Sequence, residues 1–246
     1  MATHPFELSY EIQVPAMPEQ VWDAIATGPG IDSWFMGSNE VEPREGGTLR
    51  TKSPAFDSQA TVTVWQPPTR LEYRTPEGPE GDHMVFDYRV EARERGSSVR
   101  WTHSGALAGD WETEYEAMSE GDPMYFDKLG EYLTYFLGRT ATPVEVWGPN
   151  QGEPITWELF RGPLHLDGPV QVDERVRLTP DGLDPIEGVV DCLSKSFLGV
   201  RTDDAMYRFI CGFEGSVLVG HHLFAPGIDA DATVAAWKAW LEREFS

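Results

Sequence analysis

Residues 122–138, DPMYFDKLGEYLTYFLG, predict the longest helix in the first half of the chain. Asp122 suits the N-cap position, where its carboxylate can accept from backbone N–H groups of the first turn, and Pro123 suits the first helical position. Gly138 fits the position after the last turn, where a left-handed backbone is common. Apolar side chains three or four positions apart form one stripe along this helix: Phe126, Leu129, Leu133, Phe136 and Leu137.

The sequence before this helix has the pattern of strands. Over residues 6–14, apolar and polar side chains alternate, which is typical of a strand with one buried and one solvated face. Trp65 is out of phase with Val62 and Val64, so no face is assigned to it. Turn residues separate five further segments, which predict an antiparallel meander: residues 48–52, 59–65, 70–74, 84–91 and 98–103. In the last two segments, one face is unusually aromatic.

The stretch between these strands and the helix is acidic. It carries six carboxylates between residues 110 and 122, and there is no Lys or Arg between Arg100 and Lys128. Because runs of like charge normally lie in water, we expect a solvated loop or a solvated helix face here.

The second part of the chain has a similar but shorter order of elements. Residues 139–152 are expected to form a connector that includes one strand at 144–147. A short helix near 155–160 precedes five predicted strands, at residues 175–178, 188–193, 197–202, 207–212 and 217–224. Val234, Trp237 and Leu241 then share one face of a final helix.

Five short motifs accompany this order of elements: PEQVW at 18–22, WF at 34–35, REGG at 44–47, PP at 67–68 and WTHSG at 101–105. With these motifs, the chain resembles the helix-grip fold of the START-like (SRPBCC) superfamily, and more narrowly the family related to the activator of heat-shock protein 90 ATPase. The resemblance covers roughly residues 5–138. It implies an α+β fold in which a curved antiparallel sheet wraps around a long C-terminal helix, in a domain of residues 1–142. Residues 143–246 resemble the last strands and C-terminal helix of a shortened second unit.

The resemblance also implies an elongated cavity for an apolar small molecule between the sheet and the long helix. The expected lining residues come from the aromatic strand face, the WF motif at 34–35 and the helical stripe: Trp34, Phe35, Tyr73, Phe86, Tyr88, Trp101, His103, Phe126, Leu129 and Leu133. A mostly apolar pocket with few polar groups is how small-molecule sites are usually built. The same side chains would also suit an ordinary packed core. His103 could donate or accept a hydrogen bond to a ligand.

Motifs for catalysis, metals and cofactors are missing from the sequence. It has no nucleophile elbow, no phosphate-binding glycine loop and no dinucleotide fingerprint. His221 and His222 are adjacent in a predicted strand, so their side chains should point to opposite faces and not chelate one metal. Cys192 and Cys211 match no familiar metal or redox spacing. We therefore expect no metal site and no cofactor, and we identify no catalytic residue.

The balance of charge limits the classes of partner. With 19 Lys and Arg against 41 Asp and Glu, the formal net charge is −22, which disfavours nucleic acid and anionic membranes. No apolar run is long enough to insert into a membrane. Two cysteines give no disulfide framework, and the first residues lack the pattern of a signal peptide, so we expect a cytoplasmic protein. The shortened second unit needs cover from the first domain or from another chain, which leaves a homodimer open.

Three functions follow, in order of preference. The first is non-catalytic binding of an apolar or aromatic small molecule in the helix-grip cavity. The second is an enzyme of the same fold that resembles the polyketide cyclases and aromatases and acts on a polyketide or another carbonyl compound. The third is a chaperone-associated role like that of the ATPase activator.

Overall fold

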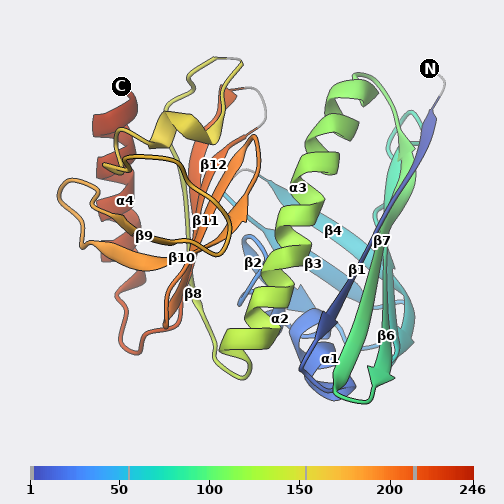
Figure 1. Ribbon diagram of the computed structural model, residues 1–246. Helices are drawn as coiled ribbons and strands as arrows, with labels where there is room; N and C mark the ends of the chain where they lie inside the picture. Colours follow the sequence, from blue (N-terminus) through green and yellow to red (C-terminus); the bar gives the residue numbers. More distant parts are fainter. Residues whose placement is uncertain (1–2, 55, 153, 213–214) are drawn as a thin grey trace. The chain divides into compact units, whose positions relative to one another are not determined.

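Twice along the chain, an antiparallel sheet is followed by a helix that completes the unit (Figure 1). The computed structural model describes residues 3–54, 56–152, 154–212 and 215–246 and separates into two compact units, Met1–Thr140 and Ala141–Ser246. The predicted α+β helix-grip fold with a shortened second unit is confirmed. No helix among these described residues is long and apolar enough to cross a membrane.

The N-terminal unit contains one seven-stranded sheet in the order β1-β7-β6-β5-β4-β3-β2, with every neighbouring pair antiparallel. Its first strand therefore lies beside its last. The predicted strands are all present, and β2 adds a four-residue strand too short to show an alternating pattern. The elements are β1 His4–Val14, α1 Pro18–Ala26, α2 Gly28–Ile31, β2 Ser38–Val41, β3 Thr48–Lys52, β4 Asp57–Gln66, β5 Arg70–Arg74, β6 His83–Arg93, β7 Gly96–Leu107 and α3 Trp111–Glu131, which continues as a π-helical segment, Tyr132–Phe136.

Helix α3 packs its apolar stripe against the sheet, with contacts to β1 and β7. Its inward side chains are almost completely buried: Phe126, Leu129, Leu133 and Phe136. Gly130 faces β1, where a Cβ at this position would make an ordinary van der Waals contact, at 3.4 Å, with Cδ1 of Ile12. The stripe read from the sequence is therefore the face that the helix buries.

The predicted start of this helix was wrong. The helix begins at Trp111, so Asp122 and Pro123 lie inside it. Two features extend it: the ring of Trp111 stacks on His4 of β1, with centroids 4.2 Å apart, and acidic residues in the first turn favour the positive end of the helix dipole. The acidic stretch is a helix face, and Asp122 is its buried exception.

Pro123 and Gly121 make the middle of α3 a weak point. Proline inside a helix removes one backbone hydrogen bond and costs about 3 kcal/mol, and glycine costs about 1 kcal/mol relative to alanine. The turns before this point are half-buried or exposed, while the turns after it carry the buried stripe. Asp122 and Pro123, which the sequence suggested as the helix start, therefore mark the boundary between a less buried first half of α3 and a well-packed second half.

A β-bulge explains why Trp65 could not be assigned a face. The pairing of β4 with β5 shifts register between Val62 and Val64, so the alternation of side chains changes phase there. Beyond the bulge, Trp65 turns inward, where its ring meets the ring of Trp22 edge-on at 4.9 Å.

The C-terminal unit repeats the plan with fewer elements. Its six-stranded sheet has the order β8-β13-β12-β11-β10-β9, so its first strand also pairs with its last. A 3-10 turn, Trp157–Phe160, occupies the predicted short helix. The strands are β8 Thr142–Trp147, β9 Arg175–Leu178, β10 Ile186–Leu193, β11 Phe197–Arg201, β12 Ala205–Cys211 and β13 Val217–Leu223, followed by helix α4 Ala230–Phe245.

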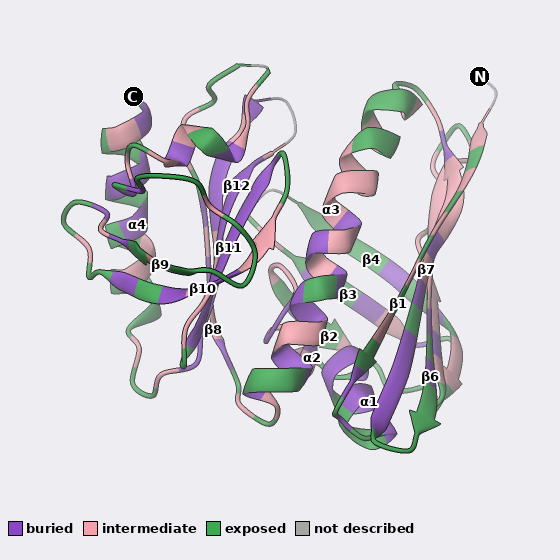
Figure 2. Cartoon of the chain, in the orientation of Figure 1, coloured by how far each residue is buried: buried purple, intermediate pink, exposed green. Residues whose placement is uncertain are grey.

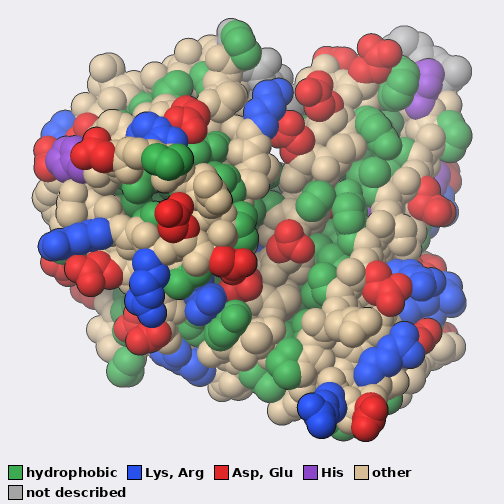
Figure 3. Space-filling view, in the orientation of Figure 1, with side chains coloured by type: hydrophobic (Ala, Val, Ile, Leu, Met, Phe, Trp, Pro, Cys, Tyr) green, Lys and Arg blue, Asp and Glu red, His purple; other side chains and the backbone are tan. Residues whose placement is uncertain are grey.

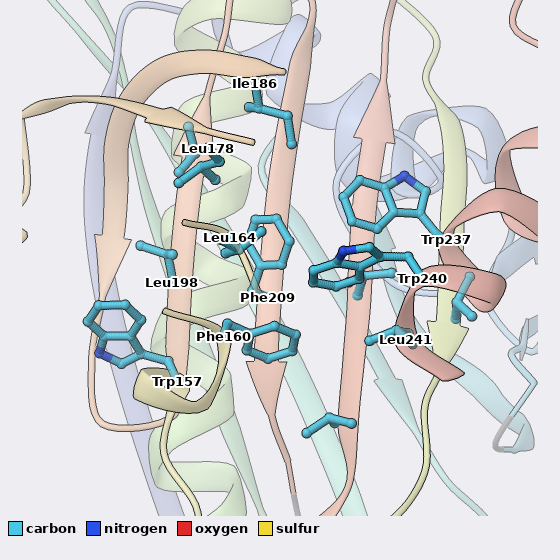
Figure 4. Packing of buried hydrophobic residues seen from close by; sticks show 14 of the residues in the cluster. Trp157, Phe160, Leu164, Leu178, Ile186, Leu198, Phe209, Trp237, Trp240 and Leu241 are labelled. Atoms are coloured by element: carbon cyan, nitrogen blue, oxygen red, sulfur yellow. The ribbon is translucent and has the colours of Figure 1, made fainter. Parts of the chain in front are cut away.

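The core of the C-terminal unit lies between its sheet and α4. The ring of Phe160 lies 5.5 Å from that of Phe209 and 6.2 Å from that of Trp240 (Figure 4). Trp237 of α4 packs edge-on against His221 at 4.4 Å. Asp229 caps α4 by accepting from the backbone N–H of Ala232 at 3.0 Å. This packing leaves the unit with a dense aromatic core.

A buried ion pair joins two strands of the same sheet. The two terminal guanidinium nitrogens of Arg208, Nη1 and Nη2, donate to Asp191 at 3.0 and 2.9 Å, and the two side chains are 0% and 2% exposed. A Cβ on Gly199 would come within 2.7 Å of either partner, so only glycine leaves room for the pair.

Candidate functional site

Five ring side chains lie in one nearly parallel layer on the inner face of the N-terminal sheet; we call this layer the ring stack. Its members come from β5, β6 and β7: Tyr73, Phe86, Tyr88, Trp101 and His103. Strand register places them together, because Phe86 lies directly opposite Tyr73 on one side and His103 on the other. The planes of Phe86 and His103 differ by 22°, with centroids 4.2 Å apart. Such offset stacking is a favourable arrangement of aromatic rings.

Helix α3 covers this layer. The ring of Phe126 lies 5.6 Å from Trp101 and 6.3 Å from Tyr10 of β1. Leu129 and Leu133 are buried in the next turns of the same face. Three of the predicted lining residues therefore come from the helix.

Trp34 and Phe35 follow α2, and the ring of Phe35 lies 4.9 Å from that of Tyr125 on α3. Their rings contact each other at 5.3 Å, and Nε1 of Trp34 donates to the carbonyl oxygen of Ala24 at 3.0 Å. Both line a pocket that also includes Tyr73 and Tyr88. Its volume of about 10 Å³ is close to that of one water position, so a larger molecule requires side chains to move.

A buried pair of polar groups joins β7 to α3. Nδ1 of His103 lies 2.8 Å from Oδ2 of Asp122, and their side chains are 4% and 12% exposed. The sequence pattern placed His103 on this face but offered Asp122 as a helix cap. No spacing rule links residues 19 positions apart, so the sequence carried no signal for the pair.

Two ring nitrogens on the same face have unused hydrogen-bonding capacity. Nε2 of His103 and Nε1 of Trp101 are buried and have no hydrogen-bond partner among the described residues. A buried polar atom without a partner costs roughly 1–3 kcal/mol, so such atoms call for an explanation in a native structure.

The tyrosines around the His103–Asp122 pair remain protonated at neutral pH. Burial raises the pKa of Tyr88 and of Tyr73, and a hydrogen bond joins their two hydroxyls. Burial, together with the negative charge of Asp122, raises the pKa of Tyr10 to about 12. Burial also raises the pKa of the Glu114 carboxyl on α3. Polar groups are thus concentrated around Asp122 within an otherwise aromatic face.

Seven of the ten predicted lining residues are buried, while Phe35, Tyr73 and Phe86 are half-buried, and the ten do not line one open cavity. Trp34, Phe35, Tyr73 and Tyr88 border the small pocket, while the others pack in the ring stack or on α3. Their role as ligand contacts stays a prediction. In the described parts of the chain, no three His, Cys, Asp or Glu side chains lie close enough to hold a metal ion.

Comparison with known proteins gives one family and several solved structures. The sequence model described as Activator of Hsp90 ATPase homolog 1-like protein matches residues 15–134. No curated protein matches the chain. A protein from Mesorhizobium loti is 23% identical, with a TM-score of 0.46, over 52% of this chain and 96% of that one. The Aha1 dimer from Colwellia psychrerythraea is 20% identical, with a TM-score of 0.44, over 52% and 96% of the two chains. A Bacillus halodurans protein is 23% identical, with a TM-score of 0.45, over 54% and 99%.

The matched residues run from the end of β1 into the π-helical segment, and they include the ring stack and α3. They also contain all five motifs that carry the resemblance. Over residues 15–134, the N-terminal unit therefore matches the activator of Hsp90 ATPase homolog 1-like family, and it has the helix-grip fold.

Proposed function

We propose that the N-terminal unit binds an apolar or aromatic small molecule against the ring stack, beneath α3. The observation that carries this proposal is an aromatic face that holds two buried ring nitrogens without partners. Apolar walls with a few directed polar groups are the usual construction of small-molecule sites. The fold of the family, a sheet gripping a long helix, supports the same reading.

Room for such a molecule must come from movement, because the pocket is small. The first half of α3 is the segment best suited to move, since Gly121 and Pro123 weaken the helix where that half ends. Figure 2 shows this half and the start of β1 as largely exposed or intermediate, and Figure 3 shows hydrophobic side chains surfacing between α3 and β1. We propose that the ligand enters from this end.

Thermal unfolding of the full chain with 1-naphthol, naphthalene or dodecanoate tests the proposal. A ligand at one hundred times its dissociation constant stabilises the folded state by about 2.7 kcal/mol, which for a unit of this size raises the unfolding midpoint by roughly 5–10 °C. We expect at least one aromatic probe to give such a shift. Midpoints that stay unchanged with all three probes up to their solubility limits would contradict small-molecule binding.

One observation favours the second function, an enzyme of the cyclase or aromatase kind. The Asp122 carboxylate beside His103 is the arrangement by which proteins orient an imidazole to take a proton from a substrate. In this reading, Nε2 of His103 would act on an acidic C–H or O–H of a carbonyl compound. A turnover of such a compound that survives His103→Ala would remove this residue from the mechanism.

The chaperone-associated role rests only on the name of the family. No contact or surface among the described residues points specifically to a chaperone, so this role stays a prediction.

A further inference from the structure

We infer that the Asp122–His103 pair forms a hydrogen-bond acceptor for an acidic hydroxyl, so that the bound molecule is a planar hydroxyarene, with a phenolic or enolic O–H. The inference rests on the proposed binding function and names the ligand class for the same site.

The contact with Asp122 decides which ring nitrogen of His103 carries a hydrogen. An ionised carboxylate can only accept hydrogen bonds, so Oδ2 of Asp122 at 2.8 Å requires a hydrogen on Nδ1 of His103. In the neutral ring, Nε2 then carries a lone pair and no hydrogen. Asp122 is therefore a positioning residue that fixes Nε2 as an acceptor.

Aromatic rings surround Nε2 of His103. His103 is packed face-on against Phe86 at 4.2 Å and edge-on against Phe6 at 5.1 Å, so the acceptor lies between aromatic walls. Phe6 and Phe86 are themselves only half-buried, although His103 is buried. A flat aromatic molecule can thus reach the acceptor by displacing side chains that are already partly exposed.

The two ring nitrogens without partners, on His103 and Trp101, limit the chemistry of the ligand. A ligand hydroxyl can donate its hydrogen to Nε2 of His103. Its oxygen can at the same time accept a hydrogen bond from the indole N–H of Trp101, which lies on the same strand face and has no partner. An aliphatic chain would leave both ring nitrogens without partners. A carboxylate ligand would meet the negative charge of Asp122, and it has no hydrogen to donate. A neutral hydroxyarene meets each of these requirements.

Calorimetric titration of the full chain with 1-naphthol and with 1-methoxynaphthalene tests the inference, because methylation removes only the donor. We expect 1-naphthol to bind at least fivefold more tightly, as one additional hydrogen bond at a buried acceptor implies. Equal affinities would overturn the inference while leaving the binding function intact. Binding of neither probe would contradict both.

Variants separate the acceptor from general effects on folding. In His103→Phe the preference for 1-naphthol should disappear. In the isosteric Asp122→Asn, the new amide can donate a hydrogen bond to Nδ1 of His103, so that the ring hydrogen moves to Nε2. The ratio of the affinities for 1-naphthol and 1-methoxynaphthalene should then fall to one or below. Glu112→Gln removes one charge from an exposed position of the same helix and should leave the preference unchanged.

Nitrogen-15 NMR of the imidazole gives a readout that a purely structural role would not move. We expect the hydrogen on Nδ1 of His103 in the unsubstituted protein and on Nε2 in Asp122→Asn. A hydrogen on Nε2 of the neutral ring in the unsubstituted protein, or a preference that persists in His103→Phe, would overturn the inference.

Discussion

Replacing Arg208 by leucine is expected to lower the free energy of unfolding of the C-terminal unit by about 3–5 kcal/mol. The substitution leaves the Asp191 carboxylate, 2% exposed, without the two hydrogen bonds that its partner donates. Because a buried charge without a partner is far more costly than a buried pair is beneficial, the loss should exceed that of most single substitutions. Denaturant unfolding monitored by signals from the C-terminal unit measures it.

Two further variants show whether the uncompensated charge is the cause. Arg208→Leu combined with Asp191→Leu removes both charges and should recover most of the lost stability. Arg177→Leu breaks an ion pair with Glu187 whose side chains are 64% and 71% exposed, and it should change stability by less than about 1 kcal/mol. A double variant as unstable as Arg208→Leu would contradict this explanation and point to packing instead.

Replacing Phe126 by alanine is expected to cost about 3–5 kcal/mol of the stability of the N-terminal unit. Its ring is buried between α3 and the ring stack, against Trp101 and Tyr10. The lost ring also leaves space at the proposed site, and an apolar cavity of this kind can accept a small aromatic molecule. Naphthalene should therefore restore part of the unfolding midpoint in Phe126→Ala.

Phe160→Ala provides the matched control for this substitution. Phe160 is equally buried but belongs to the C-terminal core (Figure 4). Its removal should cost a similar free energy, but in the C-terminal unit, and it should not alter the affinity for 1-naphthol. A loss below 1 kcal/mol in Phe126→Ala would contradict the tight packing of α3 on the ring stack.

Much of the N-terminal fold could be predicted because the signals were local. The strict alternation over residues 6–14 places β1 correctly, and the stripe from Phe126 to Phe136 identifies the buried face of α3. The true start of α3 could not be predicted, because the stacking of Trp111 on His4 is a contact between distant residues. Local cap chemistry at Asp122 favoured a start twelve residues too late, because the N-cap of α3 is Asp110.

The aromatic part of the candidate site could also be predicted, since strand parity places Tyr88, Trp101 and His103 on one face. The polar part could not. Asp122 reaches His103 only because α3 crosses β7 at that point, and neither residue has a spacing or motif that announces the pair. The same pair supplies a polar partner for His103 that the sequence did not indicate.

Hydrogen–deuterium exchange of the full chain, with and without saturating 1-naphthol, tests most directly whether the N-terminal unit binds its ligand beneath α3. Without the probe, backbone amides of residues 111–121 should exchange faster than those of residues 124–136, because the weak point at Gly121 and Pro123 separates them. With the probe, exchange should slow in β7 and in both halves of α3, while β12 and β13 of the C-terminal unit stay unchanged. Unchanged exchange in β7 and α3 at saturation, or protection confined to the C-terminal unit, would contradict the account.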